Sequence, residues 1–310
     1  ECYDRHVGSE RIALRCVSTK GVLSEYTFEQ LRDMSAQAAN FFVSQGLRKG
    51  DVLAGMLPRT VDLIAVILGA WRMGAVYQPL FTAFGPKAIE HRLKMSNARL
   101  VVTNPANASK FSEIPNHPLL AIVRDKEEPS IDGTIDFRGA LAACSSTFDP
   151  VIGRGDDLFM MMSTSGTTGL PKGVPVSMRA LASFSAYMRY AIDLREDDVF
   201  WNIADPGWAY GMYYAVAGPL MLGCATILYE GGFTAESTYS IINRLGVTSL
   251  AGSPTAFRLL IAAGEEAATV AKGQLRVVSS AGEPLNPEII RWFETHLAAP
   301  IYDHYGQTET

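Results

Sequence analysis

A stretch rich in glycine and hydroxyl residues follows an apolar run near the middle of the chain. Residues 158–162 are apolar, and the sequence continues as Ser163-Thr164-Ser165-Gly166-Thr167-Thr168-Gly169-Leu170-Pro171-Lys172-Gly173. Small residues in succession let backbone N–H groups converge on an anion, hydroxyls add donors, and a lysine adds a mobile positive charge. The loop is not a Walker A sequence, because proline precedes the lysine and glycine follows it. The pattern predicts a polyphosphate-binding loop, with a Ser/Thr/Gly-rich surface turn as the alternative.

Three further clusters of polar residues and glycine each follow a predicted strand. They are Ala-Asp-Pro-Gly-Trp-Ala-Tyr-Gly at 204–211, Ser-Ala-Gly-Glu-Pro-Leu at 280–285 and Tyr-Asp-His-Tyr-Gly-Gln-Thr-Glu-Thr at 302–310. Open α/β sheets bind ligands beyond the carboxyl ends of their strands. Taken singly, the first cluster is also compatible with a common turn and the second with a helix start. The third has no obvious role in a core, so the set predicts a ligand site.

Apolar strands alternate with longer helices along the chain. A hairpin is expected from strands at 12–17 and 22–23. A helix is then expected to start at a capping box formed by Thr27 and Gln30 and to stop at Gly46. Further strands are expected at 52–57, 76–80, 100–103, 158–162, 199–204, 225–229, 249–252, 277–282 and 301–302. Further helices are expected at 61–73, 86–96, 179–192, 234–245, 254–263 and 287–297. This alternation favours parallel sheets covered on both faces, in two subdomains of about 1–150 and 151–310.

Composition narrows the class of protein. The chain has 310 residues, 48% of them hydrophobic, and a net charge of −5, which argues against nucleic acid or an anionic membrane as the main partner. Its four cysteines are dispersed, as is typical of reduced thiols in a cytoplasmic protein, and the histidines lack zinc-ligand spacing. Residues 206–229 carry no charge but contain two prolines and four glycines. They therefore predict a buried helix and strand, not a membrane span.

The four clusters, in this order, resemble those of the AMP-forming acyl-CoA synthetases. These enzymes belong to the adenylate-forming superfamily, which also includes luciferases and peptide-synthetase adenylation domains. The order Thr-Ser-Gly-Thr-Thr-Gly-x-Pro-Lys-Gly looks like the signature loop of the superfamily. The opening Cys-Tyr-Asp-Arg-His at 2–6 is similar to the same segment of acetyl- and medium-chain members. The resemblance covers essentially the whole chain. It implies an α/β large N-terminal domain with two packed, mostly parallel sheets flanked by helices.

The resemblance also implies roles for individual residues. The ATP phosphates would be held by Thr164, Ser165, Gly166, Thr167, Thr168, Gly169 and Lys172. The adenine would be bordered by Gly282, Glu283 and Pro284, with Tyr305 stacked on it. The nucleotide pocket would be completed by Asp303, His304, Tyr305, Gly306, Gln307 and Thr308. Glu309 would be the ligand of Mg²⁺, which favours one carboxylate plus substrate phosphates. The catalytic residues would be Lys172, Thr308 (near the α-phosphate) and Glu309.

The implied reaction has two steps. A carboxylate attacks the α-phosphorus of ATP to give an acyl-adenylate and pyrophosphate, and coenzyme A then displaces AMP to form a thioester. The acyl pocket would be lined by Trp208, Ala209, Tyr210, Gly211 and Gly306, with Met212 and Tyr213 as further candidates. Acetyl-CoA synthetases carry a tryptophan where this chain has Gly306. A short- to medium-chain or small aromatic acid is therefore expected in preference to acetate.

The sequence ends inside the last cluster. The small C-terminal domain of these enzymes, with its adenylation lysine, is expected to lie outside these 310 residues. Because that domain completes the site, the fragment alone is expected to bind nucleotide weakly and to turn over poorly. Two alternatives remain open: an adenylation domain that loads a carrier protein, and a non-catalytic nucleotide-binding module. The oligomeric state is not specified by the sequence.

Overall fold

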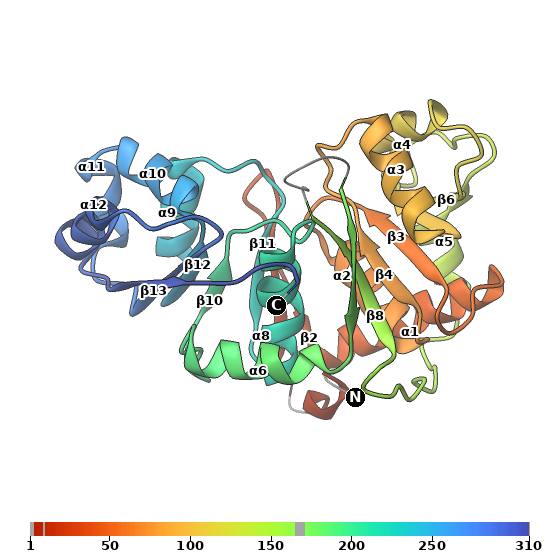
Figure 1. The fold of residues 1–310 in the computed structure, drawn as a ribbon, viewed down its shortest axis with the longest axis horizontal. Coiled ribbons are helices and arrows are strands. Elements are labelled where there is room, and N and C mark those ends of the chain that lie inside the picture. Colours follow the sequence, from red (N-terminus) through yellow and green to blue (C-terminus); the bar gives the residue numbers. More distant parts are fainter. Residues whose placement is uncertain (1–2, 9, 165–170, 310) are drawn as a thin grey trace. The chain divides into compact units, whose positions relative to one another are not determined.

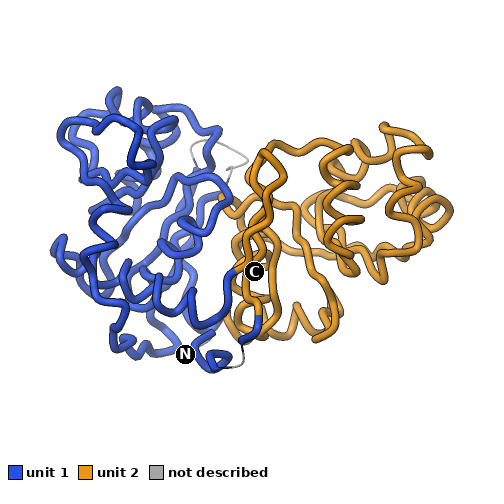
Figure 2. Tube along the Cα trace, turned by 180° about the vertical axis from the view of Figure 1, so that it is seen from behind, with its two compact units in different colours: residues 1, 3–11, 26–180 blue, residues 2, 12–25, 181–310 orange. Residues whose placement is uncertain are grey.

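The chain divides into two compact units. The computed structural model describes residues 3–8, 10–164 and 171–309 (Figure 1). Unit 1 comprises residues 3–11 and 26–180, and unit 2 comprises residues 12–25 and 181–310 (Figure 2). The division therefore falls at residue 180, not near 150, and a short N-terminal segment joins unit 2. The physical reason is strand pairing, because residues 158–177 pair with the first sheet and residues 12–17 pair with the second.

Unit 1 is built on a seven-stranded sheet in the order β7-β6-β5-β3-β4-β8-β9. Its pairs are parallel except the last, since β9 runs antiparallel to β8. The strands are β3 (Val52–Met56), β4 (Val76–Pro79), β5 (Leu100–Thr103), β6 (Leu119–Ile122), β7 (Ile135–Asp136), β8 (Leu158–Ser163) and β9 (Gly173–Ser177).

The helices of unit 1 are η1 (Asp4–His6), α1 (Phe28–Ser44), α2 (Val61–Arg72), α3 (Pro86–Ser96), α4 (Pro105–Ser112) and α5 (Phe137–Ala142). The expected capping box at the start of α1 is confirmed by reciprocal hydrogen bonds between Thr27 and Gln30. Helix α2 lies so close to α1 that a Cβ on Gly69 would stand 2.5 Å from that of Ala38. Residues of α3 and α4 form one buried cluster with β3 and β5, which covers a face of the sheet.

Unit 2 is built on a second seven-stranded sheet in the order β14-β13-β12-β10-β11-β1-β2. The pairs from β14 through to β1 are parallel. The strands are β1 (Ile12–Val17), β2 (Leu23–Thr27), β10 (Phe200–Asn202), β11 (Thr226–Tyr229), β12 (Ser249–Gly252), β13 (Val277–Ala281) and β14 (Ile301–His304). Two mostly parallel sheets flanked by helices confirm the expected α/β fold.

The helices of unit 2 begin with α6 (Ala180–Tyr190), α7 (Ala209–Gly211), the π-helical segment η2 (Met212–Ala217) and α8 (Gly218–Leu222). They continue with α9 (Ala235–Leu245), α10 (Pro254–Ala262), α11 (Glu265–Ala268), η3 (Thr269–Ala271), α12 (Pro287–Trp292) and the π-helical η4 (Phe293–Leu297). The uncharged run at 206–229 thus forms buried helix and strand, as expected. In the described part of the chain, no helix is long and apolar enough to cross a membrane.

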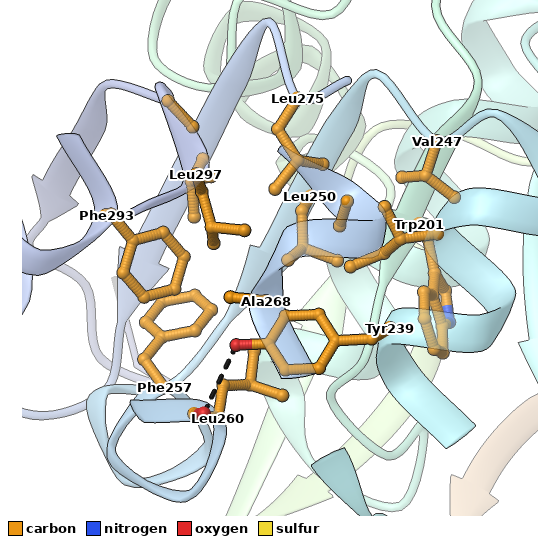
Figure 3. Close-up of a cluster of buried hydrophobic side chains, with 14 of the residues drawn as sticks. Trp201, Tyr239, Val247, Leu250, Phe257, Leu260, Ala268, Leu275, Phe293 and Leu297 are labelled. Carbon is orange, nitrogen blue, oxygen red and sulfur yellow. Dashed lines mark hydrogen bonds between the residues drawn. The ribbon is translucent and has the colours of Figure 1, made fainter. Parts of the chain in front are cut away.

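One hydrophobic core holds β12 and β13 to the helices around them (Figure 3). Phe257 of α10 meets Phe293 of η4 edge to face, with ring centroids 5.1 Å apart. The buried Tyr239 hydroxyl donates to the backbone carbonyl of Leu260 (3.2 Å). Because this core fixes the two strands, it also fixes where the polar segments that follow them begin.

Several elements were not expected from the sequence. Helices α4 and α5 and strands β6, β7 and β9 are among them. Strand β9 contains a proline and follows the glycine-rich loop, so its sequence lacks the apolar run that marks a buried strand. It forms because it pairs with β8, which is a tertiary cause.

Candidate active site

The glycine- and hydroxyl-rich loop of unit 1 connects the hairpin β8–β9. The backbone N–H of Thr164 donates to the carbonyl of Lys172 (3.0 Å), and Ser163 pairs with Gly173. Residues 165–170, which include the predicted phosphate ligands Ser165, Gly166, Thr167, Thr168 and Gly169, lie outside the described residues. The structure therefore shows the base of the loop, where it brings Thr164 and Lys172 together.

A side chain of helix α3 contacts the loop next to its cationic residue, Lys172. The Lys172 side chain is exposed and forms no salt bridge with any residue that the structure describes. Beside it, the Nε2 atom of His91 lies 2.8 Å from the backbone carbonyl oxygen of Pro171. Since a carbonyl only accepts, Nε2 is the ring nitrogen that carries the hydrogen. His91 was not among the residues expected from the sequence.

Helix α3 is itself anchored beside His91. The buried guanidinium of Arg92 lies over the ring of Phe84, 3.9 Å from its centroid. The buried side chain of Gln78 donates to the backbone carbonyl of Arg92 (3.1 Å). These contacts fix the helix turn that carries the histidine.

In unit 2, residues 204–211 form a tight turn after β10 that leads into helix α7. The Asp205 side chain accepts a hydrogen bond from the N–H of Gly207 (2.7 Å), and its carbonyl accepts from that of Trp208 (3.0 Å). A Cβ on Gly211 would collide with the Asp205 carbonyl group. Because that obstacle is backbone, the position requires glycine.

The side chain of Asn202 holds this loop through two hydrogen bonds. Asn202 was not among the residues expected from the sequence. Its side chain is 2% exposed, donates to the carbonyl of Tyr210 (3.3 Å) and accepts from the N–H of Ala204 (2.9 Å). An amide at the end of an apolar strand was the available signal, since a buried polar side chain requires partners.

The predicted acyl pocket lies beside a cluster of tyrosines. Tyr187 and Tyr214 stack with ring centroids 4.2 Å apart, and Tyr210 meets Tyr214 at 5.6 Å. The Tyr210 hydroxyl is buried and has no hydrogen-bond partner within the described residues. Because that hydroxyl is buried, a substrate cannot reach it in this arrangement. Tyr210 could contact a substrate only through its ring. Burial raises the pKa of Tyr214 to about 12, so its phenol stays neutral at physiological pH.

The last two clusters come together because β13 and β14 are neighbours. Ala281 pairs with His304, and the N–H of Leu285 donates to the Asp303 carboxylate (3.5 Å). Gly282 has a φ of +95°, a conformation that favours glycine, so the chain can turn directly after β13. The structure thus places the segment 282–285 beside Asp303 and His304, at the carboxyl ends of the two paired strands.

Two predicted residues in this region differ in how they are held. Tyr305 is 83% exposed, so its ring is accessible to a stacking partner. Glu283 is instead engaged, since it accepts hydrogen bonds from Thr255 (2.8 Å) and Arg258 (2.7 Å) of α10. Its carboxylate therefore holds the segment in place, and the backbone around it remains for a ligand.

His304 and Thr308 contact side chains that the sequence did not link to them. The ring of His304 lies 5.4 Å from that of Tyr187. Burial lowers the pKa of His304 against the opposing effect of Asp303, so this histidine is neutral at physiological pH. The Thr308 carbonyl accepts a hydrogen bond from the Tyr213 hydroxyl (3.3 Å).

Comparisons with known proteins agree with this arrangement. A family model described as AMP-binding enzyme matches residues 5–310. The chain belongs to the AMP-binding enzyme family. Acetyl-coenzyme A synthetase of Bacillus subtilis (strain 168) is 36% identical over 100% of this chain and 55% of its own length. The enzyme of the same name from Pseudoalteromonas translucida (strain TAC 125) is 32% identical over 100% of this chain and 52% of its own.

A solved structure is similar over the same region. The crystal structure of Brucella canis acyl-CoA synthetase superposes with a TM-score of 0.97 at 66% identity, covering 99% of this chain and 56% of that one. The chain of this AMP-binding enzyme thus spans about half the length of the relatives it matches.

The predicted metal ligand suits the cation that the family resemblance implies. Glu309 is exposed, and no group of three or more histidine, cysteine or acidic residues in the described chain could form a metal site of its own. Magnesium is commonly held by one or two carboxylates together with substrate phosphates and water. A single exposed carboxylate in this AMP-binding enzyme fits that pattern, and Glu309 would hold the ion.

A pocket of about 240 Å³ in unit 1 lies away from these residues. Its lining comes from residues just before or at the start of β3, β4 and β8 and from Met178 after β9, and it includes the Lys49–Asp157 ion pair (2.7 Å). None of the predicted site residues of this AMP-binding enzyme lines it. It opens at the amino ends of the strands, whereas ligands of open α/β sheets bind at the carboxyl ends.

Proposed function

We propose that the full-length protein activates a carboxylic acid with ATP and Mg²⁺ and transfers the acyl group to coenzyme A. The observation that carries this proposal is that the segment 282–285 meets the start of the segment 303–309 at the carboxyl ends of two paired strands. The hairpin loop that ends in Lys172 supports it, because it has the composition of a polyphosphate site. The relatives, named acetyl- and acyl-CoA synthetase, support the same reaction.

The first chemical step forms an acyl-adenylate. A carboxylate oxygen of the acid attacks the α-phosphorus of ATP, the bond between the α- and β-phosphates breaks, and pyrophosphate leaves. Lys172 and the loop backbone would neutralise the leaving phosphates, and Thr308 would contact the α-phosphate. Bound Mg²⁺ supplies further charge neutralisation. Positioning and electrostatics carry most of the catalysis in such a transfer, because the protein forms no covalent bond.

The second step consumes the adenylate. The sulfur of coenzyme A attacks the acyl carbonyl carbon and a thioester bond forms. The bond between that carbon and the phosphate oxygen breaks, AMP leaves with its electron pair, and the thiol proton is lost to solvent. We propose that this step also needs residues outside this chain, which spans about half the length of the relatives it matches. Coenzyme A and the acid would then be the small-molecule partners besides ATP.

We further propose that the acid is a short- to medium-chain or small aromatic one. A Cβ on Gly306 would meet no described atom within 4 Å, so nothing there replaces the indole of the acetate-specific pattern. Trp208, 39% exposed, offers apolar surface to an acyl chain. The dispersed cysteines favour a cytoplasmic location for this chemistry.

The test is pyrophosphate release by the full-length protein with ATP and Mg²⁺ over acetate, butyrate, hexanoate, octanoate and benzoate, each with and without coenzyme A. We expect release to peak at one acid longer or bulkier than acetate and to accelerate with coenzyme A. Acid-dependent release without a response to coenzyme A would instead support a ligase for a carrier protein. Nucleotide binding without release for any acid would support a non-catalytic module.

A further inference from the structure

A buried tyrosine outside the predicted nucleotide motif holds the backbone of that motif. The Tyr213 hydroxyl donates to the carbonyl oxygen of Thr308 at 3.3 Å. Thr308 and the next residue, Glu309, are the two to which the resemblance gives roles at the α-phosphate and at Mg²⁺. The hydrogen bond therefore acts on the peptide group between them.

The tyrosine ring is fixed by its surroundings. Tyr213 lies in the π-helical segment η2, a rare geometry that is frequent at functional sites. It is 4% exposed, and its ring stacks on that of Phe184 from α6, with centroids 4.4 Å apart and planes at 24°. The ring of Tyr214 closes another side edge-on at 6.0 Å. Because the ring cannot turn away, its hydroxyl is aimed at the motif in advance.

The protonation state of the Tyr213 hydroxyl allows it to donate a hydrogen bond at all times. Burial raises the pKa of Tyr213, and the charges of a Tyr214 phenolate and of Glu309 act in the same direction. The group therefore stays protonated throughout the physiological range and can donate at all times. A neutral donor also leaves the negative charge of Glu309 intact for a cation.

We propose that Tyr213 is a positioning residue for the nucleotide, which it serves by fixing the orientation of the Thr308–Glu309 peptide. With this peptide fixed, the Thr308 side chain and the Glu309 carboxylate keep one orientation before ATP binds. Less conformational entropy of these side chains is then lost on binding. This assigns to Tyr213 a role different from a wall of the acyl pocket. The inference rests on the proposed function for the identity of the nucleotide.

The test compares Tyr213→Phe with Tyr214→Phe in the full-length protein. The first change removes the hydroxyl and leaves the ring to stack on Phe184. The second is matched, because it removes a hydroxyl from the next residue of the same segment, one that bonds to no described residue of the motif. We would measure AMP binding by calorimetry without acid or Mg²⁺, and separately the KM values for ATP and for the acid.

For Tyr213→Phe we expect AMP binding to weaken about 3- to 10-fold, as loss of one hydrogen bond implies, and the KM for ATP to rise similarly. The KM for the acid should stay unchanged, and Tyr214→Phe should bind AMP like the parent. Equal AMP affinity in all three proteins would overturn the proposal. A change confined to the acid KM would overturn it too and return Tyr213 to the acyl pocket.

These outcomes are separable from a failure of the proposed function. AMP binding is measured with no acid present, so it reports on the motif even if the parent releases no pyrophosphate. A fall in melting temperature alone, with unchanged AMP affinity, would indicate a purely structural hydrogen bond and would also contradict the proposal.

Discussion

The two units hold their motifs in different ways. In unit 1 the motif is the loop of a hairpin, fixed at its base by the Thr164–Lys172 backbone hydrogen bond and by His91 at Pro171. In unit 2 the motifs follow parallel strands, and side chains from other elements hold their backbone, as Asn202 and Tyr213 do. Both kinds of motif receive a side chain that is distant in sequence, since His91 lies 80 residues from Pro171 and Tyr213 lies 95 residues from Thr308. The difference is that backbone pairing between β8 and β9 closes the unit 1 loop locally, whereas the unit 2 motifs rely on side chains for their orientation. We therefore expect substitutions in the two units to affect activity and stability differently.

The largest expected effect is at the charged end of the unit 1 loop. Lys172→Met keeps most of the side-chain length but removes the cation proposed for the phosphates, so we expect kcat/KM for ATP to fall about 100-fold. Melting temperature should not change, because the side chain is exposed and forms no salt bridge with any described residue. Steady-state kinetics and a thermal melt check both. Lys126→Met, at an exposed surface position, is the control, and equal kinetics for the two variants would refute the assignment.

The next effect concerns the choice of acid in unit 2. Gly306→Trp would fill the space left by the glycine, so we expect kcat/KM for octanoate relative to acetate to fall about 10- to 100-fold. Competition assays with paired acids measure this ratio directly. Gly306→Ala, whose methyl group meets no described atom within 4 Å, should leave the ratio nearly unchanged. An unaltered ranking of acids in the tryptophan variant would remove Gly306 from the pocket.

A third change tests the backbone of unit 2. Gly211→Ala forces a methyl group against the Asp205 carbonyl, so the 205–211 loop must shift. We expect a loss of about 1–3 kcal/mol in the free energy of unfolding, typical of overpacking. Denaturant titration against Gly306→Ala, which adds the same methyl in open space, isolates the steric cause. Equal stability of both variants would mean that the loop accommodates the methyl freely.

The smallest effect is at the support of the unit 1 loop. His91→Ala removes the donor to Pro171, and we expect the KM for ATP to rise about 2- to 5-fold, the value of one hydrogen bond. His91→Gln retains an N–H donor and should recover part of the loss. If alanine and glutamine behave alike, the histidine packs against the loop without orienting it.

What the sequence predicted well follows from local patterns. The capping box of Thr27 and Gln30 is formed by neighbours in sequence, and the alternation of apolar strands and helices specified both sheets. The strand expected at 277–282 is β13, which ends one residue earlier, at Ala281. Such features depend on few residues close together.

What the sequence did not predict depends on tertiary contact. Strand β9 exists because β8 lies beside it, and Asn202, Tyr213 and His91 act on backbone atoms of other elements. No spacing rule connects Tyr213 with Thr308 across the sequence that separates them. The roles of the predicted site residues themselves stay predictions, including those of 165–170, which lie outside the described residues.

The measurement that tests the central claim most directly is acid-dependent exchange of labelled pyrophosphate into ATP by the full-length protein. Exchange requires reversible formation of an acyl-adenylate and needs no coenzyme A, so it isolates the step assigned to the residues of this chain. We expect label in ATP only when a suitable acid is present, and about 100-fold slower exchange in Lys172→Met. No exchange with any acid, in a protein that still binds AMP, would contradict the account.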